Sequence, residues 1–265
     1  MKKSMICCLA SVLVWSGAAW AGEYPADPLD SPMWDYRANE ILGDAEVVFD
    51  DAVQVIVPQL AENQHVFPVT VDASALPDVK RIVIFADLNP IPVAIDYRPI
   101  NARAFVATRI KLDQRTPVRA AVQTGDGRWH VSGVWVDAAG GGCSAPPVSR
   151  VKGDWAQHLG EMRGAAWPDH DDTRIRVSFR HPMDTGLVEN ISAYNIDTLS
   201  VTAADGTKLA EMSVFGAVAE DPVFTMIVKD AGEAPIAVSA RDTAGLEFDG
   251  SVSRRAGVDL LAQAR

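Results

Sequence analysis

Cysteine is scarce in this chain of 265 residues. It occurs at Cys7, Cys8 and Cys143, and the first two lie in a short apolar stretch that follows two N-terminal lysines. A small-residue cleavage pattern ends at Ala21, so residues 1–21 are expected to be a secretory signal peptide and the protein to be periplasmic. The mature chain then keeps one cysteine, Cys143, which excludes a disulfide framework within the chain.

Signatures of catalysis and of nucleic-acid binding are also missing. The sequence has no phosphate loop, no C-x-x-C-H haem motif and no convincing Ser-His-Asp order. Lys and Arg number 24 against 35 Asp and Glu, and the formal net charge of -11 repels nucleic acid and anionic lipid. After the signal, no apolar run approaches the roughly 20 residues that cross a bilayer. We therefore expect no cofactor, no nucleic-acid partner and no membrane association after signal cleavage.

The five histidines do not form a recognisable metal motif. The best candidate is the His170-Asp171-Asp172 group, but nothing at a helical or hairpin spacing completes a site. A solvated turn is the favoured interpretation, and no metal site is predicted. His181 stands in the segment HPMDTG, where Pro182 would stop a strand and Gly186 would permit a turn.

Short alternating segments, separated by turn residues, predict an all-β protein with a few short helices. Turns such as Gly125-Asp126-Gly127 fall between them, and the segment 89–92 (NPIP) is interpreted as a plain edge loop rather than a docking loop. A short helix is expected over 33–42. Expected strands cover 66–72, 81–87, 93–97, 104–112, 118–124 and 128–136, then 174–179, 196–202, 208–213, 223–228 and 236–241.

Between the two strand series lies a segment of a different composition, DAAGGGCSAPP (residues 137–147). It contains no bulky apolar residue, so it cannot be a core strand; a glycine-rich stretch of about ten residues spans roughly 17 to 19 Å. We interpret it as a flexible arm that displays the Cys143 thiol. The arm residues are Gly140, Gly141, Gly142 and Ser144. The competing interpretation is an ordinary linker with an accidental cysteine, which would be a liability in an oxidising compartment.

These patterns divide the chain into seven parts. The expected parts are a signal peptide (1–21), an N-terminal lead with a short helix (22–43), a first β-sandwich (44–137), a Gly/Pro linker with the cysteine (138–152), a helical connector (153–172), a second β-sandwich (173–252) and a C-terminal tail (253–265).

At this point the sequence resembles a known family. Both halves look like parts of the SoxYZ sulfur-oxidising carrier complex, fused in one chain. The SoxY-like half shows VFPVTVDAS (66–74), ALPDVKRIVIFADLNPIP (75–92), ATRIKL (107–112), PVRAAV (117–122) and then GGC. The SoxZ-like half shows RHPMDTGL (180–187), IDTLSV (196–201) and FGAVAEDPVFTMIV (215–228).

The resemblance implies two immunoglobulin-like β-sandwich domains and a carrier without its own catalytic site. It implies that Cys143 bears a sulfur-containing cargo covalently, as in thiosulfate oxidation, and that partner enzymes load and process it. In SoxY the pattern GGCGG ends the chain, whereas here Ser144 follows the cysteine and the chain continues. The arrangement looks like the fused carriers associated with quinoprotein alcohol dehydrogenases, so partners are periplasmic sulfur-processing enzymes or such a dehydrogenase system.

Three functions stay open on the sequence. The first is the covalent carrier, for which a disulfide-linked homodimer through Cys143 is a further possibility. The second is a noncovalent accessory module for a quinoprotein dehydrogenase. The third is a stand-alone thiol enzyme, which needs a preorganised site around the sulfur that a glycine-rich arm would supply poorly.

Overall fold

The computed structural model describes residues 24–229 and 234–254. The expected signal peptide and most of the expected tail lie outside these ranges. Helices are short: α1 (Trp34–Leu42), α2 (Val148–Lys152) and the 3-10 turn η1 (Trp155–Gln157). The strands are β1 (Val47–Phe49), β2 (Gln54–Ile56), β3 (Leu60–Ala61), β4 (Phe67–Asp72), β5 (Val79–Ala86), β6 (Val93–Pro99), β7 (Ala102–Ile110), β8 (Thr116–Thr124), β9 (Trp129–Ala138), β10 (Met162–Asp169), β11 (Asp172–Phe179), β12 (Ile196–Thr202), β13 (Lys208–Val214), β14 (Val223–Lys229), β15 (Ile236–Asp242) and β16 (Glu247–Val252).

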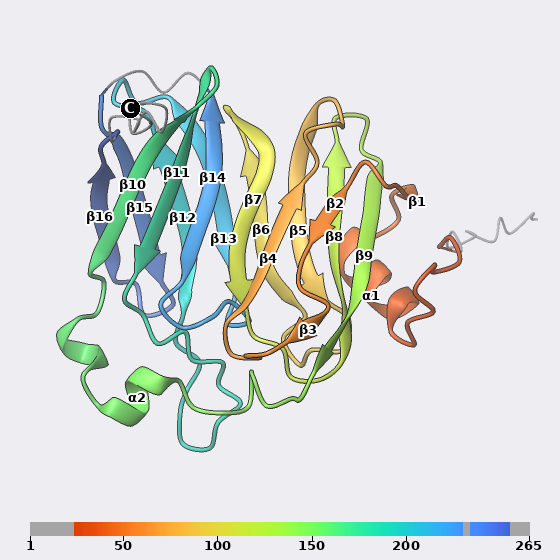
Figure 1. Cartoon of the computed structure of the whole chain (residues 1–265), viewed down its shortest axis with the longest axis horizontal. Coiled ribbons are helices and arrows are strands. Elements are labelled where there is room, and N and C mark those ends of the chain that lie inside the picture. Colours follow the sequence, from red (N-terminus) through yellow and green to blue (C-terminus); the bar gives the residue numbers. More distant parts are fainter. Residues whose placement is uncertain (1–23, 230–233, 255–265) are drawn as a thin grey trace, which may run out of the picture.

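Two sheets lie face to face across the whole molecule (Figure 1). The larger sheet has the order β1-β9-β8-β5-β6-β13-β12-β15-β16, with β3 beside β9, and the smaller has the order β10-β11-β14-β7-β4-β2. The predicted all-β class is confirmed. Most neighbours are antiparallel, whereas β1 and β3 run parallel to β9.

The two halves meet edge to edge in both sheets. In the larger sheet β6 pairs with β13, so that Tyr97 lies opposite Met212. In the smaller sheet β7 pairs with β14, where Val106 lies opposite Met226. One cluster of buried apolar side chains runs from Val53 to Val252 through both halves. The sequence predicted two domains joined by the arm; backbone hydrogen bonds and a shared core join them as well.

Strand periodicity explains why these segments fold as they do. In β7 buried and partly buried residues alternate without a break, whereas in β8 all but one of nine residues are buried. The buried face of β7 points into the core, and β8 is an interior strand of the larger sheet with β9 and β5 on its flanks. On the side away from the core, α1 covers the part of that sheet formed by β5, β8 and β9.

Helix α1 uses the four-residue spacing of a helix face. Trp34, Ala38 and Leu42 are all buried and pack against Phe85 and Trp129 of the larger sheet. The expected helix over 33–42 is therefore confirmed within one residue. This packing places α1 on the N-terminal half, beside the loop that follows β5.

The predicted helical connector over 153–172 is wrong. After α2 and η1, strand β10 begins at Met162 and pairs with β11 along its whole length, so that much of the second part of the connector is sheet and only the short η1 turn is helical. Gly164 disfavours helix and fits β10, because a Cβ there would lie 2.6 Å from Val252 Cγ2. No helix among the described residues is long and apolar enough to cross a membrane.

Candidate functional site

Cys143 lies in the thiol loop, defined as residues 139–147 between β9 and α2. This loop crosses the lower end of the molecule, where the first half meets the second (Figure 1). The Cys143 side chain is fully buried, with 0% of its surface exposed. The expectation of a freely displayed thiol is therefore wrong for this conformation. Glycine composition indicated freedom of the backbone, but here the glycines allow the loop to pack closely.

Asp113 holds the backbone on either side of the sulfur. Its Oδ1 accepts hydrogen bonds from the Cys143 amide (3.0 Å), the Ser144 amide (3.2 Å) and the Ser144 hydroxyl (3.0 Å). The Asp113 carbonyl also accepts from the Gly141 amide at 3.2 Å. One acidic side chain thus binds three donors of the loop, and charge-assisted hydrogen bonds of this kind are stronger than neutral ones.

Glycines of the loop are required by its geometry, as Gly141 and Gly142 show. Gly141 has a positive φ of 83°, which side-chain-bearing residues rarely adopt. At Gly142 the constraint is space: a Cβ would lie 2.4 Å from the carbonyl oxygens of both Gln64 and Leu112. The Gly142 amide donates to that Leu112 oxygen at 3.1 Å. The glycines expected to loosen the arm instead let it dock.

The second half of the chain binds the same loop. Thr185 Oγ1 donates to the Cys143 carbonyl at 2.7 Å. Beyond the loop, Arg150 of α2 pairs with the buried carboxylate of Asp184, with Nε 3.0 Å from Oδ2. The Val148 amide donates to Glu220 at 2.6 Å. Contacts from both halves therefore anchor the loop.

A buried lysine lies behind the thiol. The Lys111 ammonium donates to the carbonyls of Met183 and Gly216, both from the second half. The Cys143 sulfur lies 3.9 Å from the Lys111 carbonyl oxygen. Burial lowers the pKa of Lys111 to about 8, while negative charge on Cys143 and Asp184 opposes that shift. The lysine thus places a positive charge where a thiolate would form.

Burial nevertheless dominates the ionisation of the thiol. It raises the pKa of Cys143 to about 12; the Lys111 charge opposes this rise and the Asp113 charge adds to it. At neutral pH the docked sulfur is therefore a protonated thiol. Since the thiolate is the nucleophile, the docked thiol is protected from reaction.

The 89–92 segment is more than an edge loop. Asn89 is buried, and its amide group donates to the Lys111 carbonyl at 2.8 Å and accepts from the Asp113 amide at 2.9 Å. Arg37 of α1 in turn donates to the carbonyls of Asp87, at 3.0 Å, and of Asn89, at 3.5 Å. A series of contacts thus runs from α1 through Asn89 to the residues that hold the thiol loop.

Sequence reasoning singled out Cys143 and its neighbours but missed Asn89, Lys111, Asp113 and Thr185. Two signals were available. Lys111 is a charged residue between Ile110 and Leu112 in the expected strand 104–112, and Thr185 belongs to the HPMDTG segment already noted. The role of Asp113 had no such signal, because its contacts with residues 143 and 144 depend on the fold.

His181 is a buried core residue. Its Nδ1 accepts from the Met183 amide at 3.1 Å, its ring lies 4.6 Å from that of Tyr194, and burial lowers its pKa to about 4. His170 is exposed beside Asp169. Among the described residues, no three His, Cys, Asp or Glu side chains are grouped so that they could hold a metal ion.

Comparison with known proteins divides the chain in the same way. The model of the family "Sulfur oxidation protein SoxY" matches residues 38–143, and that of "Sulphur oxidation protein SoxZ" matches residues 162–253. No curated protein sequence matches the chain. Similar solved structures include the sulfur carrier protein SoxY from Chlorobium limicola f thiosulfatophilum, which is 24% identical over 40% of this chain and 91% of that chain, with a TM-score of 0.36. A second is SGBP-B of the Bacteroides ovatus mixed-linkage glucan utilization locus, at 14% identity over 71% of this chain and 41% of that chain, with a TM-score of 0.22.

Proposed function

Since this chain joins a SoxY-family segment and a SoxZ-family segment in one polypeptide, we propose that it carries a sulfur-containing intermediate covalently on Cys143. The two families support a sulfur-carrier role in general terms. The choice of residue rests on one observation: the SoxY match ends at residue 143, the cysteine held by residues of both halves.

The geometry adds a condition to this proposal. A sulfur with no exposed surface cannot meet a partner enzyme or hold a further group, because protein interiors are packed without spare volume. Loading therefore requires the thiol loop to leave its docked position. We infer a closed form, which protects the thiol, and an open form, in which the thiol ionises at its ordinary pKa and reacts.

The chemistry of loading requires a partner. Joining the Cys143 sulfur to the sulfur of a second thiol-type compound forms one S–S bond and releases two electrons and two protons. An electron-accepting enzyme must take the electrons, so the chain acts as a carrier rather than as a complete enzyme. Periplasmic sulfur-processing enzymes, or a quinoprotein dehydrogenase system, are the partner classes we propose, with the periplasm as the location.

One observation favours a second function. The high pKa and the burial of Cys143 are also what an inert core cysteine would show. In that case the chain would be a noncovalent accessory module for a quinoprotein dehydrogenase. The Cys143 side chain would then have a packing role only, and the reactivity of its sulfur would not contribute to function.

Mass spectrometry of the protein isolated from its own host distinguishes the two. Cells are grown with a reduced sulfur compound, and thiols are blocked at lysis. We expect an added mass on the peptide that contains Cys143, lost on treatment with a reductant and absent from Cys143→Ser. Recovery of only the blocked free thiol, together with normal growth of the Cys143→Ser strain, would support the accessory module instead.

A further inference from the structure

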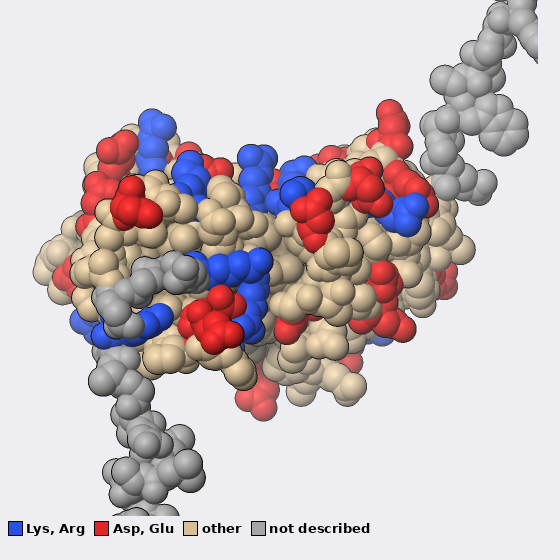
Figure 2. Space-filling model, turned by 90° about the horizontal axis from the view of Figure 1, so that it is seen from above, with Lys and Arg blue, Asp and Glu red and all other residues tan. Residues whose placement is uncertain are grey.

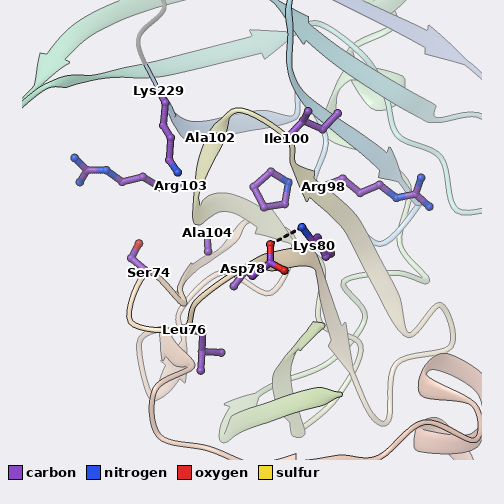
Figure 3. Close-up of a pocket in the computed structure, with 12 residues that line it drawn as sticks. Ser74, Leu76, Asp78, Lys80, Arg98, Ile100, Ala102, Arg103, Ala104 and Lys229 are labelled. Atoms are coloured by element: carbon purple, nitrogen blue, oxygen red, sulfur yellow. Dashed lines mark hydrogen bonds and ion pairs between the residues drawn. The ribbon is translucent and has the colours of Figure 1, made fainter. Parts of the chain in front are cut away.

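A pocket of about 700 Å³ opens at the end of the molecule away from the thiol. We call it the seam pocket, because the chain reversal between β6 and β7 and the end of β14 contribute to it from the two halves (Figure 3). Strand β7 begins at the pocket with Ala102, and its other end leads directly to Lys111 beside the thiol loop. Nine residues of strand correspond to roughly 30 Å, so the seam pocket and Cys143 are separate sites.

Cationic side chains dominate the polar lining. They are Lys80, Arg98, Arg103 and Lys229, and the acidic lining residue is Asp78. Two of the cations are already neutralised: Lys80 pairs with Asp78, and Arg103 pairs with Asp172. This leaves a local excess of positive charge in a chain whose formal net charge is -11. Figure 2, which views this end from above, shows Lys and Arg side chains gathered over its middle among acidic groups.

The remaining two cations form no ion pair within the described ranges; the acidic residues opposite them in the sheets, Glu211 and Asp172, pair instead with Lys208 and Arg103. Arg98 ends β6 of the first half, and Lys229 ends β14 of the second. In Figure 3 the Lys229 side chain extends into the pocket, while Arg98 extends along its opposite side. A concave site lined by charge of one sign attracts ions of the other. The uncompensated charge of about two fits a ligand with two negative groups.

Apart from Ser74, the rest of the lining is apolar. Leu76, Pro99 and Ile100 border the pocket, and Ile100 leaves 47% of its surface exposed. A volume of about 700 Å³ is in the range of small-molecule sites and far exceeds what a simple inorganic anion fills. Carbon atoms of a ligand would cover Ile100, while its acid groups meet the two cations.

We propose that the seam pocket binds a small organic dianion, with one acid group on Arg98 and the other on Lys229. The ligand bridges the two halves at their junction and leaves the thiol end of the molecule free. The proposal does not depend on the chemistry of Cys143, and it holds whether the chain is a covalent carrier or an accessory module.

Binding of simple dicarboxylates tests the proposal. Succinate, glutarate and adipate are titrated into the full chain at constant ionic strength, and backbone amide signals are followed by NMR. We expect saturable shifts that include Leu76, Ile100 and Ala102 for at least one of the three. Butyrate, which has one charge, and sulfate, which has no carbon skeleton, are expected to bind at least about fivefold more weakly.

Single neutral substitutions locate the site. Arg98→Gln and Lys229→Gln are each expected to weaken the best dicarboxylate at least about fivefold. Lys152→Gln removes the same charge from α2 at the other end and is expected to leave binding unchanged, as is Cys143→Ser. The absence of saturable binding, equal binding of sulfate, or equal loss in Lys152→Gln would each overturn the proposal.

Discussion

Thr185→Val is expected to expose the thiol to reagents without changing the cysteine itself. The substitution removes the hydrogen bond from Thr185 Oγ1 to the Cys143 carbonyl, and the one that Oγ1 accepts from the exposed Leu187 amide, at nearly constant side-chain volume. A hydrogen bond of this kind contributes about 0.5 to 1.5 kcal/mol net. If the docked loop loses that amount relative to the open loop, the population of the open form rises roughly 2- to 12-fold.

The labelling rate of Cys143 with a thiol reagent reports this population. With a pKa of about 12, the docked sulfur is ionised roughly a thousandfold less often at neutral pH than a free cysteine, so labelling proceeds through the open form. We expect the folded wild-type protein to react far more slowly than the urea-unfolded chain. Thr185→Val should then react roughly 2- to 12-fold faster than wild type.

Thr185→Ser is the matched control, because it keeps the hydroxyl. Its labelling rate should stay close to that of the wild type. Labelling of Thr185→Val at the wild-type rate would show that the bond does not hold the loop. Labelling of the folded wild type as fast as the unfolded chain would show that the loop is not docked in solution.

Three further changes test other parts of the structure. Gly142→Ala should undock the thiol loop and speed labelling more than Thr185→Val does, because its Cβ would lie 2.4 Å from two carbonyl oxygens; Ser144→Ala, which loses one hydroxyl bond, is the milder comparison. Arg119→Ala leaves the carboxylates of Asp87 and Asp27 buried without their partner. Measured by urea-induced unfolding, it should lower the free energy of unfolding by about 3 to 5 kcal/mol, and a loss below about 1 kcal/mol would contradict this. His181 has a folded pKa of about 4, below its ordinary value, so its contribution to the free energy of unfolding is complete above about pH 6.5 and is lost as pH falls towards 4, by about 3 kcal/mol at most. In urea unfolding measured between these pH values, His181→Asn should show a weaker dependence of stability on pH. An unchanged dependence would exclude His181 as its source.

Much of the fold could be predicted from the sequence because its signals are local. Alternation in 104–112 predicted β7, which begins and ends two residues earlier, and the short helix expected over 33–42 matches α1 within one residue. The continuous sheets could not be predicted in this way. The pairing of β6 with β13 depends on which strand edges meet, and periodicity within one strand carries no information about its neighbour.

In the candidate site, too, some features could be predicted from the local sequence and others depend on tertiary packing. The isolated Cys143 and the glycines around it were visible in the composition, but composition cannot distinguish a loop that is free from one that is docked. Asp113 lies 30 residues before the cysteine and Thr185 lies 42 residues after it. Their contacts with the loop exist only once both halves have packed together, so the conformation of the thiol is a property of the tertiary structure.

Fusion of the two halves sets how far the thiol can move once it is released. The loop is held at one end by β9, which ends at Ala138, and at the other by α2, which begins at Val148 and is anchored through Arg150. From either anchor to Cys143 there are about five residues, which reach at most roughly 18 Å when fully extended. A chain that ends shortly after its cysteine could enter a narrow channel as a single segment. In this loop the chain continues on both sides of Cys143, so two backbone segments would have to enter together. A partner must therefore offer a site wide enough for both backbone segments of the loop, unless the Arg150–Asp184 pair breaks and α2 moves with the loop.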